Sequence, residues 1–427
     1  MTYKVAVVGG GWAGCSAALS AASAGAEVHL FEKTDMLLGT GLVGGIMRNN
    51  GRYTAAEEGL MLGGGGELFA ITDQVSRHKD IEFPGHEHAS LYDTTAIEPA
   101  VKRKLQDAGV HLHLSTRIVD AVTSRSGIER IYKASGEAFF ADVFVDATGT
   151  SGPMGNCQRY GNGCVMCIQR CPAFGPRKSL TALVGVAERA AVKRVDVPGA
   201  MSGSGKLNTD SLSAEIQQEL HQQGVALVPV PEELVRESKL ASKACQQYAT
   251  SEYAHNLILL DTGHAKLMAP YMPLEELRQV PGLEKARFED PYAGGVGNSI
   301  RFTAIAPRDN HLKVDGMNNL FCAGEKSGIY VGHTEAICTG ALAGHNAARQ
   351  VAGLDLLQLP RTTAIGEFIA FGREELKSEE GWTKSYTFAG SVFFERMNKM
   401  GLHITDQDKI DERISKIDLA NAFSQTL

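Results

Sequence analysis

The first thirty residues of this 427-residue chain carry the pattern that most constrains its fold. The apolar run at residues 5–8 predicts a buried strand, the small residues at 13–24 predict a helix, and residues 27–31 predict a second strand. Two strands joined by a crossover helix lie parallel in one sheet. The sequence therefore predicts an α/β fold built on a Rossmann-type sheet.

The turn between the first strand and the helix has the glycine spacing of a dinucleotide site. Gly9 permits the tight turn, Gly11 lets the backbone approach a pyrophosphate, and Gly14 lets the helix pack on the strand. Glu32 ends the second strand, where a carboxylate can accept hydrogen bonds from a ribose. The residues of this unit that we assign to the cofactor are Gly9, Gly11, Trp12, Ala13, Gly14, Glu32 and Lys33.

Two later segments favour FAD over a nicotinamide cofactor. Residues 141–149 form an apolar strand that runs into a glycine turn, and residues 320–323 form another strand that precedes a helix of small residues. Flavoproteins of the glutathione-reductase type close their FAD site with such a late segment. The chain has only one β-α-β nucleotide fingerprint, so we expect no separate NAD(P)H domain. The further predicted FAD contacts are Gly39, Gly44, Gly45, Ala147, Thr148, Gly149, Gly324, Glu325, Gly332, His333 and Thr334.

The late segment also carries a family resemblance. Its positions are Leu320-Phe321, Ala323-Gly324, Gly332, Glu335, Gly340, Ala343-Gly344 and Asn346-Ala347-Ala348, preceded by "APRDNHL" at 306–312. In these residues, in the N-terminal unit and in the loop 38–45, the chain resembles the GidA (MnmG) family of tRNA-uridine-modifying flavoproteins and the related folate-dependent tRNA methyltransferase, TrmFO. The resemblance implies a glutathione-reductase-type fold and bound FAD.

Two departures separate this chain from those enzymes. They use catalytic cysteines, in GidA one beside the glycine loop after the second strand, whereas residues 38–51 here contain no cysteine. His333 stands where those families usually have tyrosine. The resemblance therefore implies a shared scaffold and bound FAD, and it is less specific for the reaction.

Four of the eight cysteines are concentrated in residues 157–172. Cys164, Cys167 and Cys171, followed by a proline, repeat the C-x2-C-x3-C-P tail of a bacterial ferredoxin motif, and Cys157 lies upstream across a short glycine loop. This spacing predicts a [4Fe–4S] cluster close to the flavin. Zinc held by four thiolates is the main alternative, and a redox-active dithiol or unligated thiols also remain open. The other cysteines are predicted to be small buried residues: Cys15, Cys245, Cys322 and Cys338.

Other candidate side chains carry weaker patterns. His333 and Tyr292 are the candidates for a catalytic acid or base, although structural duty in a turn is the favoured interpretation of Tyr292. The histidines at 78, 86 and 88 are predicted to be solvated loop residues rather than metal ligands. Arg170, Arg177 and Lys178 are expected to form a solvated basic patch, with docking of an acidic carrier or anionic substrate as the alternative.

These patterns suggest a discontinuous arrangement of domains. Residues 1–50, 95–155 and 300–350 are predicted to form the FAD-binding domain. Residues 52–94 and 156–299 are predicted to form an inserted α+β cap or substrate domain, with helices starting near 212 and 232 and a strand at 256–261. Residues 351–427 have helical periodicity and are expected to cover the FAD domain or form a homodimer interface.

Net charge, hydropathy and cysteine spacing restrict the partners and the cellular compartment that we expect for the chain. A net charge of −7 argues against an extensive nucleic-acid surface. No apolar run reaches the roughly 18–20 residues that span a membrane, and the N-terminus does not resemble a signal peptide. Cysteines at uneven spacing favour a reducing cytoplasm over a disulfide framework.

The favoured function is an FAD-dependent oxidoreductase in which a [4Fe–4S] cluster relays electrons to or from the flavin. Its partner would be a small-molecule redox substrate or an electron carrier such as a ferredoxin. The alternative is a tRNA-modifying flavoenzyme related to the folate-dependent tRNA uracil methyltransferase, with tRNA as its substrate. A non-catalytic electron-transfer or assembly protein is the third hypothesis.

Overall fold

The computed structural model describes residues 3–125, 127–149, 171–190, 192–194, 197–198, 200–201, 205–242, 248–268, 272–289, 300–301 and 304–427. Cys157, Cys164, Cys167, Cys245 and Tyr292 therefore lie outside the described residues.

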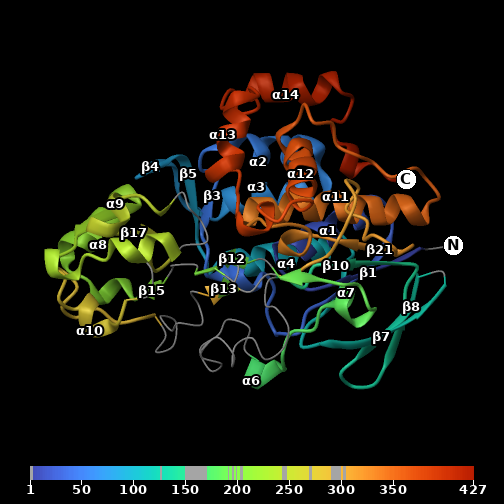
Figure 1. The fold of residues 1–427 in the computed structure, drawn as a ribbon, viewed down its shortest axis with the longest axis horizontal. Coiled ribbons are helices and arrows are strands. Elements are labelled where there is room, and N and C mark those ends of the chain that lie inside the picture. The colour runs from blue at the N-terminus through green and yellow to red at the C-terminus, as the bar shows by residue number, and fades with distance from the viewer. Residues whose placement is uncertain are drawn as a thin grey trace.

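The core of the fold is a five-stranded sheet with the order β21-β10-β1-β2-β6 (Figure 1). All four pairings between neighbouring strands are parallel. Its strands are β1 (Lys4–Val8), β2 (Glu27–Phe31), β6 (His111–His113), β10 (Val143–Asp146) and β21 (Leu320–Cys322). The predicted Rossmann-type α/β fold is thus confirmed.

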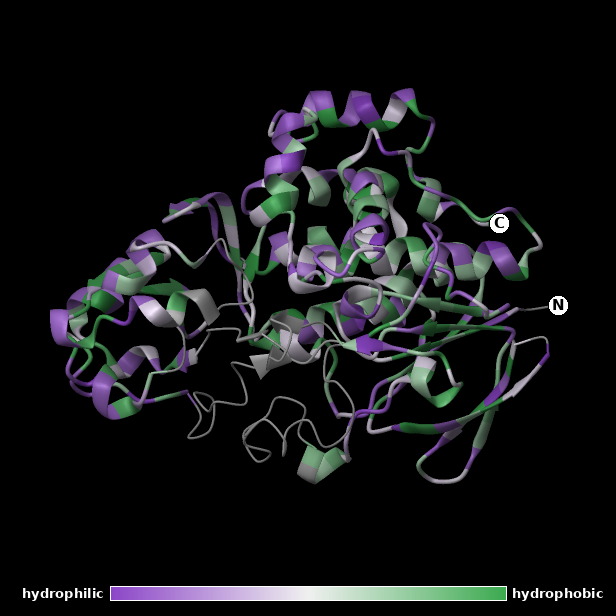
Figure 2. Cartoon of the chain, in the orientation of Figure 1, coloured by the Kyte–Doolittle hydropathy of each residue, from purple (hydrophilic) through white to green (hydrophobic). Residues whose placement is uncertain are grey.

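Helices and small antiparallel sheets surround this sheet. The main helices near it are α1 (Trp12–Ser23), α2 (Gly51–Leu62), α3 (Leu68–Gln74), α4 (Ile97–Asp107) and α11 (His333–Val351). One antiparallel sheet joins β3 (Ile46–Met47), β5 (His86–Tyr92) and β4 (Ser76–Phe83); another joins β7 (Ile118–Ser124), β8 (Gly127–Lys133) and β9 (Ala138–Phe140). Figure 2 shows apolar residues among the strands and helices at the centre of the molecule, whereas the helices at its periphery are mixed in hydropathy.

A separate lobe has its own four-stranded antiparallel sheet and apolar core. The sheet has the order β15 (Gly205–Leu207), β18 (Ala265–Leu267), β17 (Asn256–Asp261) and β16 (Val225–Pro229). Three helices accompany it: α8 (Ala214–Gln223), α9 (Glu252–His255) and α10 (Leu274–Leu277). The strand predicted at 256–261 is confirmed, and the helix predicted near 212 begins at Ala214. The helix predicted near 232 is only a 3₁₀ turn, Glu232–Leu234, which follows Pro231.

Short elements connect this lobe to the central sheet. They are α6 (Cys171–Phe174), α7 (Leu180–Leu183), β11 (Arg189–Ala190), β12 (Val192–Arg194), β13 (Val197–Pro198), β14 (Ala200–Met201), β19 (Ile300–Arg301) and β20 (Ala304–Ile305). β11 pairs with β20 and β14 with β19, so the chain leaves for the lobe and returns from it along adjacent strands. The predicted domain boundaries themselves stay a prediction.

The C-terminal residues are helical, as predicted, and pack onto α2. The helices are α12 (Ala364–Glu375), α13 (Ser391–Lys399) and α14 (Gln407–Lys416). Glu58 of α2 is fully buried and accepts hydrogen bonds from the Ala364 and Ile365 N–H groups at 2.9 and 3.0 Å. The Arg413 guanidinium on α14 lies 3.0 Å from the same carboxylate. One buried acid therefore ties two C-terminal helices to the body of the protein.

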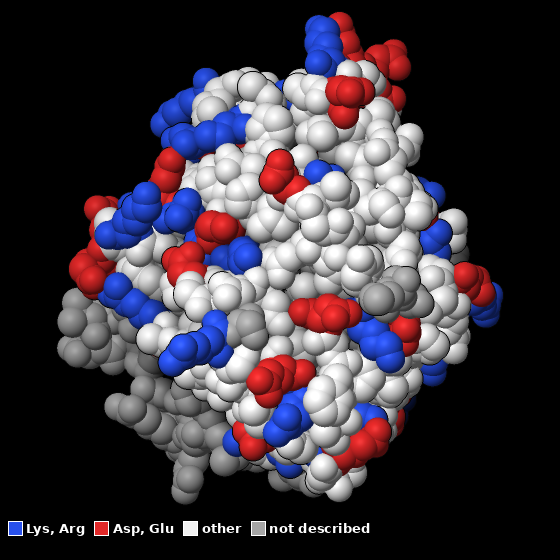
Figure 3. Space-filling view, turned by 90° about the vertical axis from the view of Figure 1, so that its right-hand side faces the viewer, with Lys and Arg blue, Asp and Glu red and all other residues white. Residues whose placement is uncertain are grey.

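Charges of both signs are interspersed on the face of the molecule in Figure 3. Among the described residues, no helix is both long and apolar enough to cross a membrane.

Candidate functional site: the FAD-binding end of the sheet

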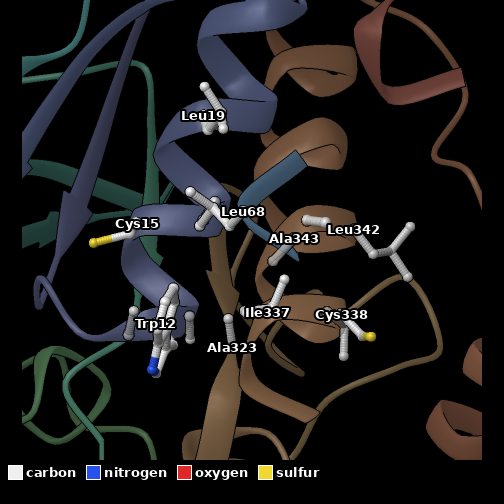
Figure 4. Close-up of a cluster of buried hydrophobic side chains, with 14 of the residues drawn as sticks. Trp12, Cys15, Leu19, Leu68, Ala323, Ile337, Cys338, Leu342 and Ala343 are labelled. Atoms are coloured by element: carbon white, nitrogen blue, oxygen red, sulfur yellow. The ribbon is translucent and has the colours of Figure 1, made fainter. Parts of the chain in front are cut away.

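Two parallel helices bring their N-termini to the same end of the sheet. A Cβ atom on Gly340 would lie 2.2 Å from the Ala13 carbonyl oxygen, and one on Gly344 would lie 2.0 Å from the Ala17 carbonyl oxygen. The constant offset in residue number means that α1 and α11 run in the same direction. In Figure 4, Leu19 of α1 and Ala343 of α11 belong to one cluster of buried apolar side chains, while Cys15 and Cys338 point away from each other. Both helix N-termini therefore present N–H groups at the carboxyl ends of the strands.

The glycines of the first turn serve different purposes. Gly9 has a φ of +104°, and a Cβ there would lie 2.4 Å from the Ala147 carbonyl oxygen. A Cβ on Gly14 would lie 1.7 Å from the Gly9 carbonyl oxygen. Both residues are therefore required by the protein's own packing.

Gly11 is different, because a Cβ there would meet no atom of the described chain within 4 Å. Its φ of −71° is also compatible with any residue. Among the described residues, a Cβ on Gly39 or on Gly149, two other predicted FAD contacts, would likewise meet no atom within 4 Å. Three predicted cofactor glycines thus leave room beside the backbone, as a bound pyrophosphate requires.

The Glu32 carboxylate, just after β2, is hydrogen-bonded to the glycine turn. One carboxylate oxygen accepts a hydrogen bond from the Gly10 N–H at 2.8 Å, and the other accepts from the Thr34 N–H at 2.8 Å and its hydroxyl at 3.0 Å. A carboxylate has about four acceptor positions, so the carboxylate retains capacity for a ribose hydroxyl. Lys33, predicted as the neighbouring contact, instead donates to the Gly175 carbonyl at 3.1 Å.

A buried polar network holds the turn after β10. Asp146 is fully buried; one of its oxygens accepts from the Thr148 N–H at 3.0 Å and hydroxyl at 2.7 Å, and the other accepts from the Thr181 N–H at 2.8 Å. Burial alone would raise the pKa of Asp146, but the nearby Lys326 ammonium and these hydrogen bonds keep that pKa below its usual value. Asp146 is therefore a buried carboxylate that shapes the Thr148 loop.

Lys326 supplies the opposing charge from the turn after β21. Its side chain is fully buried, pairs with the Glu188 carboxylate and donates to the Ala304 carbonyl at 3.0 Å. Burial lowers the pKa of Lys326, and Asp146 and Glu188 act in the opposite direction. The predicted contacts Gly324 and Glu325 lie in the same 3₁₀ turn, so the ion pair fixes the position of that turn.

The sequence does not indicate Arg177 as a cofactor residue and predicts that its side chain is solvated. That prediction is wrong, because the residue is only 9% exposed. Its guanidinium donates to the Thr148 hydroxyl at 2.9 Å, and its Nε has no hydrogen-bond partner among the described residues. Burial lowers the pKa of Arg177, while Asp146, Glu188 and Glu325 act to raise it. An incompletely paired guanidinium at the Thr148 turn is suited to a phosphate or other anion.

His333 begins α11 and contacts the loop after β2. Its Nδ1 lies 3.2 Å from the Tyr92 hydroxyl, which also donates to the Gly41 carbonyl at 2.6 Å. Because a phenol has one proton, His333 Nδ1 must be the donor in its pair with Tyr92, which leaves the lone pair of the neutral ring on Nε2. A Cβ on Gly44 would lie 1.8 Å from His333 Cε1. The predicted residues Gly44 and His333 are thus brought together, and Trp12 completes the aromatic group, 5.9 Å from Tyr92 and 6.3 Å from His333 between ring centroids.

A second buried network lies behind His333. The Arg52 Nε donates to a Glu335 oxygen at 3.1 Å, and another Arg52 nitrogen donates to the Asn49 oxygen at 3.2 Å. Asn49 in turn contacts His86 Nδ1 at 2.8 Å. All four residues are at most 5% exposed, so the prediction of a solvated His86 is wrong. His78 and His88 instead lie on β4 and β5 and pair with Asp261 and Asp80.

The buried His86 imidazole makes stability depend on pH. Burial, with a smaller contribution from Arg52, lowers the pKa of His86 to about 3, against about 6.5 in an unfolded chain. The unfolded state therefore binds more protons below about pH 6.5, and stability is lost as the pH falls toward 3. We expect a loss of about 2 kcal/mol from this residue at about pH 5. Urea unfolding at about pH 7.5 and about pH 5 measures the free energy of unfolding of the wild type and of His86→Gln. Between these two pH values it should fall by about 2 kcal/mol less in the variant than in the wild type. An equal fall in both proteins would contradict the assignment.

The family of the chain follows from the comparison with protein-family models. Residues 4–271 and 261–355 match the model of glucose inhibited division protein A, GidA. The chain belongs to the GidA family. This family is FAD-dependent, and the open glycines, Glu32 and the two helix N-termini fit that cofactor.

Individual relatives match over shorter stretches. The TrmFO methylenetetrahydrofolate–tRNA-(uracil-5-)-methyltransferase of Dinoroseobacter shibae is 36% identical over 95 residues, which are 22% of this chain and 20% of that protein. The tRNA uridine 5-carboxymethylaminomethyl modification enzyme MnmG of Metamycoplasma arthritidis is 27% identical over 173 residues, 40% of this chain and 26% of that protein. The matched stretches therefore span only about a fifth to a quarter of these GidA-family relatives.

The similarity in structure is more extensive. GidA of Aquifex aeolicus, in its form II crystal, superposes with a TM-score of 0.72 at 16% identity, over 99% of this chain and 74% of that chain. At this identity the comparison supports the fold. The form I crystal of the same protein gives a TM-score of 0.67.

The cysteine predictions have separate outcomes in this GidA-family chain. Cys15, Cys322 and Cys338 are buried, as predicted, and burial raises the pKa of each thiol, that of Cys322 to about 12. Of the four motif cysteines, only Cys171 is described; it lies at the start of α6 with its Sγ 4.0 Å from Lys33 Nζ. The [4Fe–4S] cluster stays a prediction.

The remaining predicted residues lie in the loops around the site. Ala147 and Thr148 follow β10, and Thr334 lies in the first turn of α11, where its hydroxyl is 3.5 Å from the Met47 sulfur. A Cβ on Gly45 would lie 2.4 Å from Thr262 at the end of β17. Lys266 of β18 also donates to the Val43 carbonyl at 2.6 Å. The loop before β3 therefore connects the second lobe to the site.

Proposed function

We propose that this chain is an FAD-dependent enzyme that modifies a uridine base of tRNA. The match of residues 4–355 to the GidA family carries this proposal. The names of TrmFO and MnmG indicate tRNA uridines as the substrates of those relatives. The cytoplasmic location and the homodimer stay predictions.

The residues described above would divide the binding of FAD between them. The open backbone at Gly11 and Gly149 and the N-terminus of α1 suit the pyrophosphate, and Arg177 is placed to add a positive charge. Glu32 suits the ribose of the adenosine. When bound, FAD supplies hydride transfer, and the protein positions its ring and excludes competing reactions.

His333 is the proposed proton-transfer residue of this site. Its Nδ1 pairs with the Tyr92 hydroxyl, which places the lone pair of the neutral ring on Nε2, the atom that would accept a proton and then return it. Burial raises the pKa of Tyr92, which keeps its hydroxyl protonated as a donor to Gly41. The pair thus fixes both the tautomer and the direction of the imidazole.

Replacing His333 with phenylalanine should separate proton transfer from cofactor binding. We expect kcat to fall by about 10²- to 10⁴-fold, the usual contribution of a positioned acid or base, while bound FAD is retained. Steady-state kinetics and flavin absorbance measure the two quantities. His255→Phe, in the distant lobe, is the matched control because His255 is 54% exposed. An unchanged kcat in His333→Phe would show that this residue does not transfer the proton.

A flavin–cluster oxidoreductase is the second candidate, and the donor set of the cysteine motif favours it. Four thiolates are the usual ligands of a [4Fe–4S] cluster and also make a closed zinc site. The absence of cysteine from residues 38–51 also separates this chain from GidA enzymes that use one there. Its partner would then be a small redox substrate or a ferredoxin-like carrier.

Anaerobic purification distinguishes the two candidates. The protein is measured for its visible spectrum, for iron and acid-labile sulfide, and for co-purifying RNA. Flavin together with bound tRNA supports the proposed function. Flavin with about four iron and four sulfide per chain, and no affinity for tRNA, would favour the oxidoreductase instead.

A further inference from the structure

The edge of the central sheet carries a cluster of histidines that the FAD site does not use. His29 of β2 is paired in register with His111 of β6. Glu27 and His113 lie two residues away on the same two strands. Because alternate residues of a strand point to the same side, all four side chains lie on one face of the sheet.

The four side chains are in direct contact. His29 Nε2 is 3.0 Å from a Glu27 carboxylate oxygen, and His29 Nδ1 is 2.9 Å from His113 Nε2. The His29 and His111 rings are stacked, with centroids 4.6 Å apart and planes inclined by 21°. One ligand atom from each of Glu27, His29 and His111 lies within 4.8 Å of the other two. Within the described part of the chain, no other group of three such residues satisfies this criterion.

The cluster is also accessible. The side chain of His29 is 12% exposed and that of Glu27 is 26% exposed, and His111 is exposed. Phe139 of β9 packs against the His29 ring at 4.6 Å between centroids. The imidazoles are thus supported on one side by apolar packing and open to solvent on the other.

We propose that Glu27, His29 and His111 bind one divalent transition-metal ion of the Zn²⁺ class. Two imidazole nitrogens and a carboxylate oxygen are a suitable donor set for zinc, whereas Mg²⁺ and Ca²⁺ prefer oxygen ligands alone. Water would complete the coordination. The ion would take the place of the proton between His29 and Glu27 and displace Lys4, whose ammonium is 3.3 Å from Glu27.

His113 is a positioning residue in this arrangement. With the ion bound to His29 Nε2, the Nδ1–H of His29 donates to His113 Nε2 and fixes the orientation of the ring. The site lies at the start of β2, about 16 Å of extended strand from Glu32 at its cofactor end. Its expected effect is therefore structural, because the ion joins edge strand β6 to β2.

The test is calorimetric titration with ZnCl₂ of the full chain in which the four motif cysteines are replaced with serine. One ion should bind per chain. His111→Ala in this background should abolish that binding, and His113→Ala should weaken it by about 10- to 100-fold. His255→Ala is the matched control, because this exposed histidine also lies near a glutamate and should leave binding unchanged.

Cobalt provides a second measurement that does not require the cysteine replacements. In the wild-type chain, Co²⁺ at this site should give d–d bands characteristic of nitrogen and oxygen ligands, and these bands should disappear in His111→Ala while any thiolate charge-transfer bands persist. Binding that is identical in His111→Ala and its parent would overturn the proposal. So would the absence of saturable Zn²⁺ binding in a folded cysteine-free parent, which would leave the histidines as a hydrogen-bonded chain only.

Discussion

Gly11→Val should leave the protein folded and remove most of its FAD. A Cβ atom at this position would meet no atom of the described protein within 4 Å, and the φ of −71° suits valine. The added methyl groups would instead occupy the space through which a pyrophosphate approaches the backbone. We expect FAD affinity to fall by about 100-fold or more, equivalent to about 2.7 kcal/mol. Flavin fluorescence titration measures the affinity, and circular dichroism verifies the fold.

Two other glycines serve as controls for this prediction. Gly205→Ala in β15 meets its nearest atom, in Phe288, at 3.7 Å, and should keep both fold and FAD. Gly14→Ala would place a Cβ 1.7 Å from the Gly9 carbonyl oxygen, and should lose both together. If Gly11→Val binds FAD as tightly as the wild type, the pyrophosphate does not lie beside this turn.

Lys326→Met should be among the most destabilising single substitutions in the chain. The ammonium is fully buried and faces the Glu188 and Asp146 carboxylates. Removing one partner of a buried ion pair leaves an uncompensated charge, which costs about 3–5 kcal/mol. We expect the free energy of unfolding, measured in urea, to fall by this amount. FAD affinity should fall as well, because the same network holds the Thr148 loop.

An ion pair on the surface is the control that distinguishes the effect of burial from the effect of losing a charge. Lys416 lies 2.7 Å from Glu412 on α14 and is 69% exposed, so Lys416→Met should cost less than about 1 kcal/mol. The double variant Lys326→Met with Glu188→Gln should be more stable than Lys326→Met alone, because it removes a stranded carboxylate. Equal effects of Lys326→Met and Lys416→Met would show that the buried network contributes little.

The parts of the fold that could be predicted from sequence are those with local patterns. The glycines at 9, 11 and 14, with their flanking strands, indicate the β-α-β unit, because turn, helix packing and strand are consecutive in the chain. The late segment that begins at β21 is recognisable for the same reason. The two later strand segments favoured FAD over a nicotinamide cofactor, and the family resemblance implied the same cofactor.

The residues that were missed depend on contacts between distant segments. Arg177 has the sequence environment of a surface residue, and only its contact with Thr148, across the cysteine motif, reveals that it is buried. His86 lies in a polar segment, yet its strand returns against Asn49. Tyr92 has no local signal at all, and its place beside His333 arises from residues far apart in the chain. No periodicity encodes such pairings.

Nucleoside analysis of tRNA tests the central claim most directly. Total tRNA from a strain that lacks this gene is digested and compared by mass spectrometry with tRNA from the same strain carrying the wild-type gene or Gly11→Val. The account predicts that one modified uridine is missing from the deletion strain, returns with the wild-type gene and does not return with Gly11→Val. Identical nucleoside profiles in all three strains would contradict it and leave the flavin–cluster oxidoreductase as the better account.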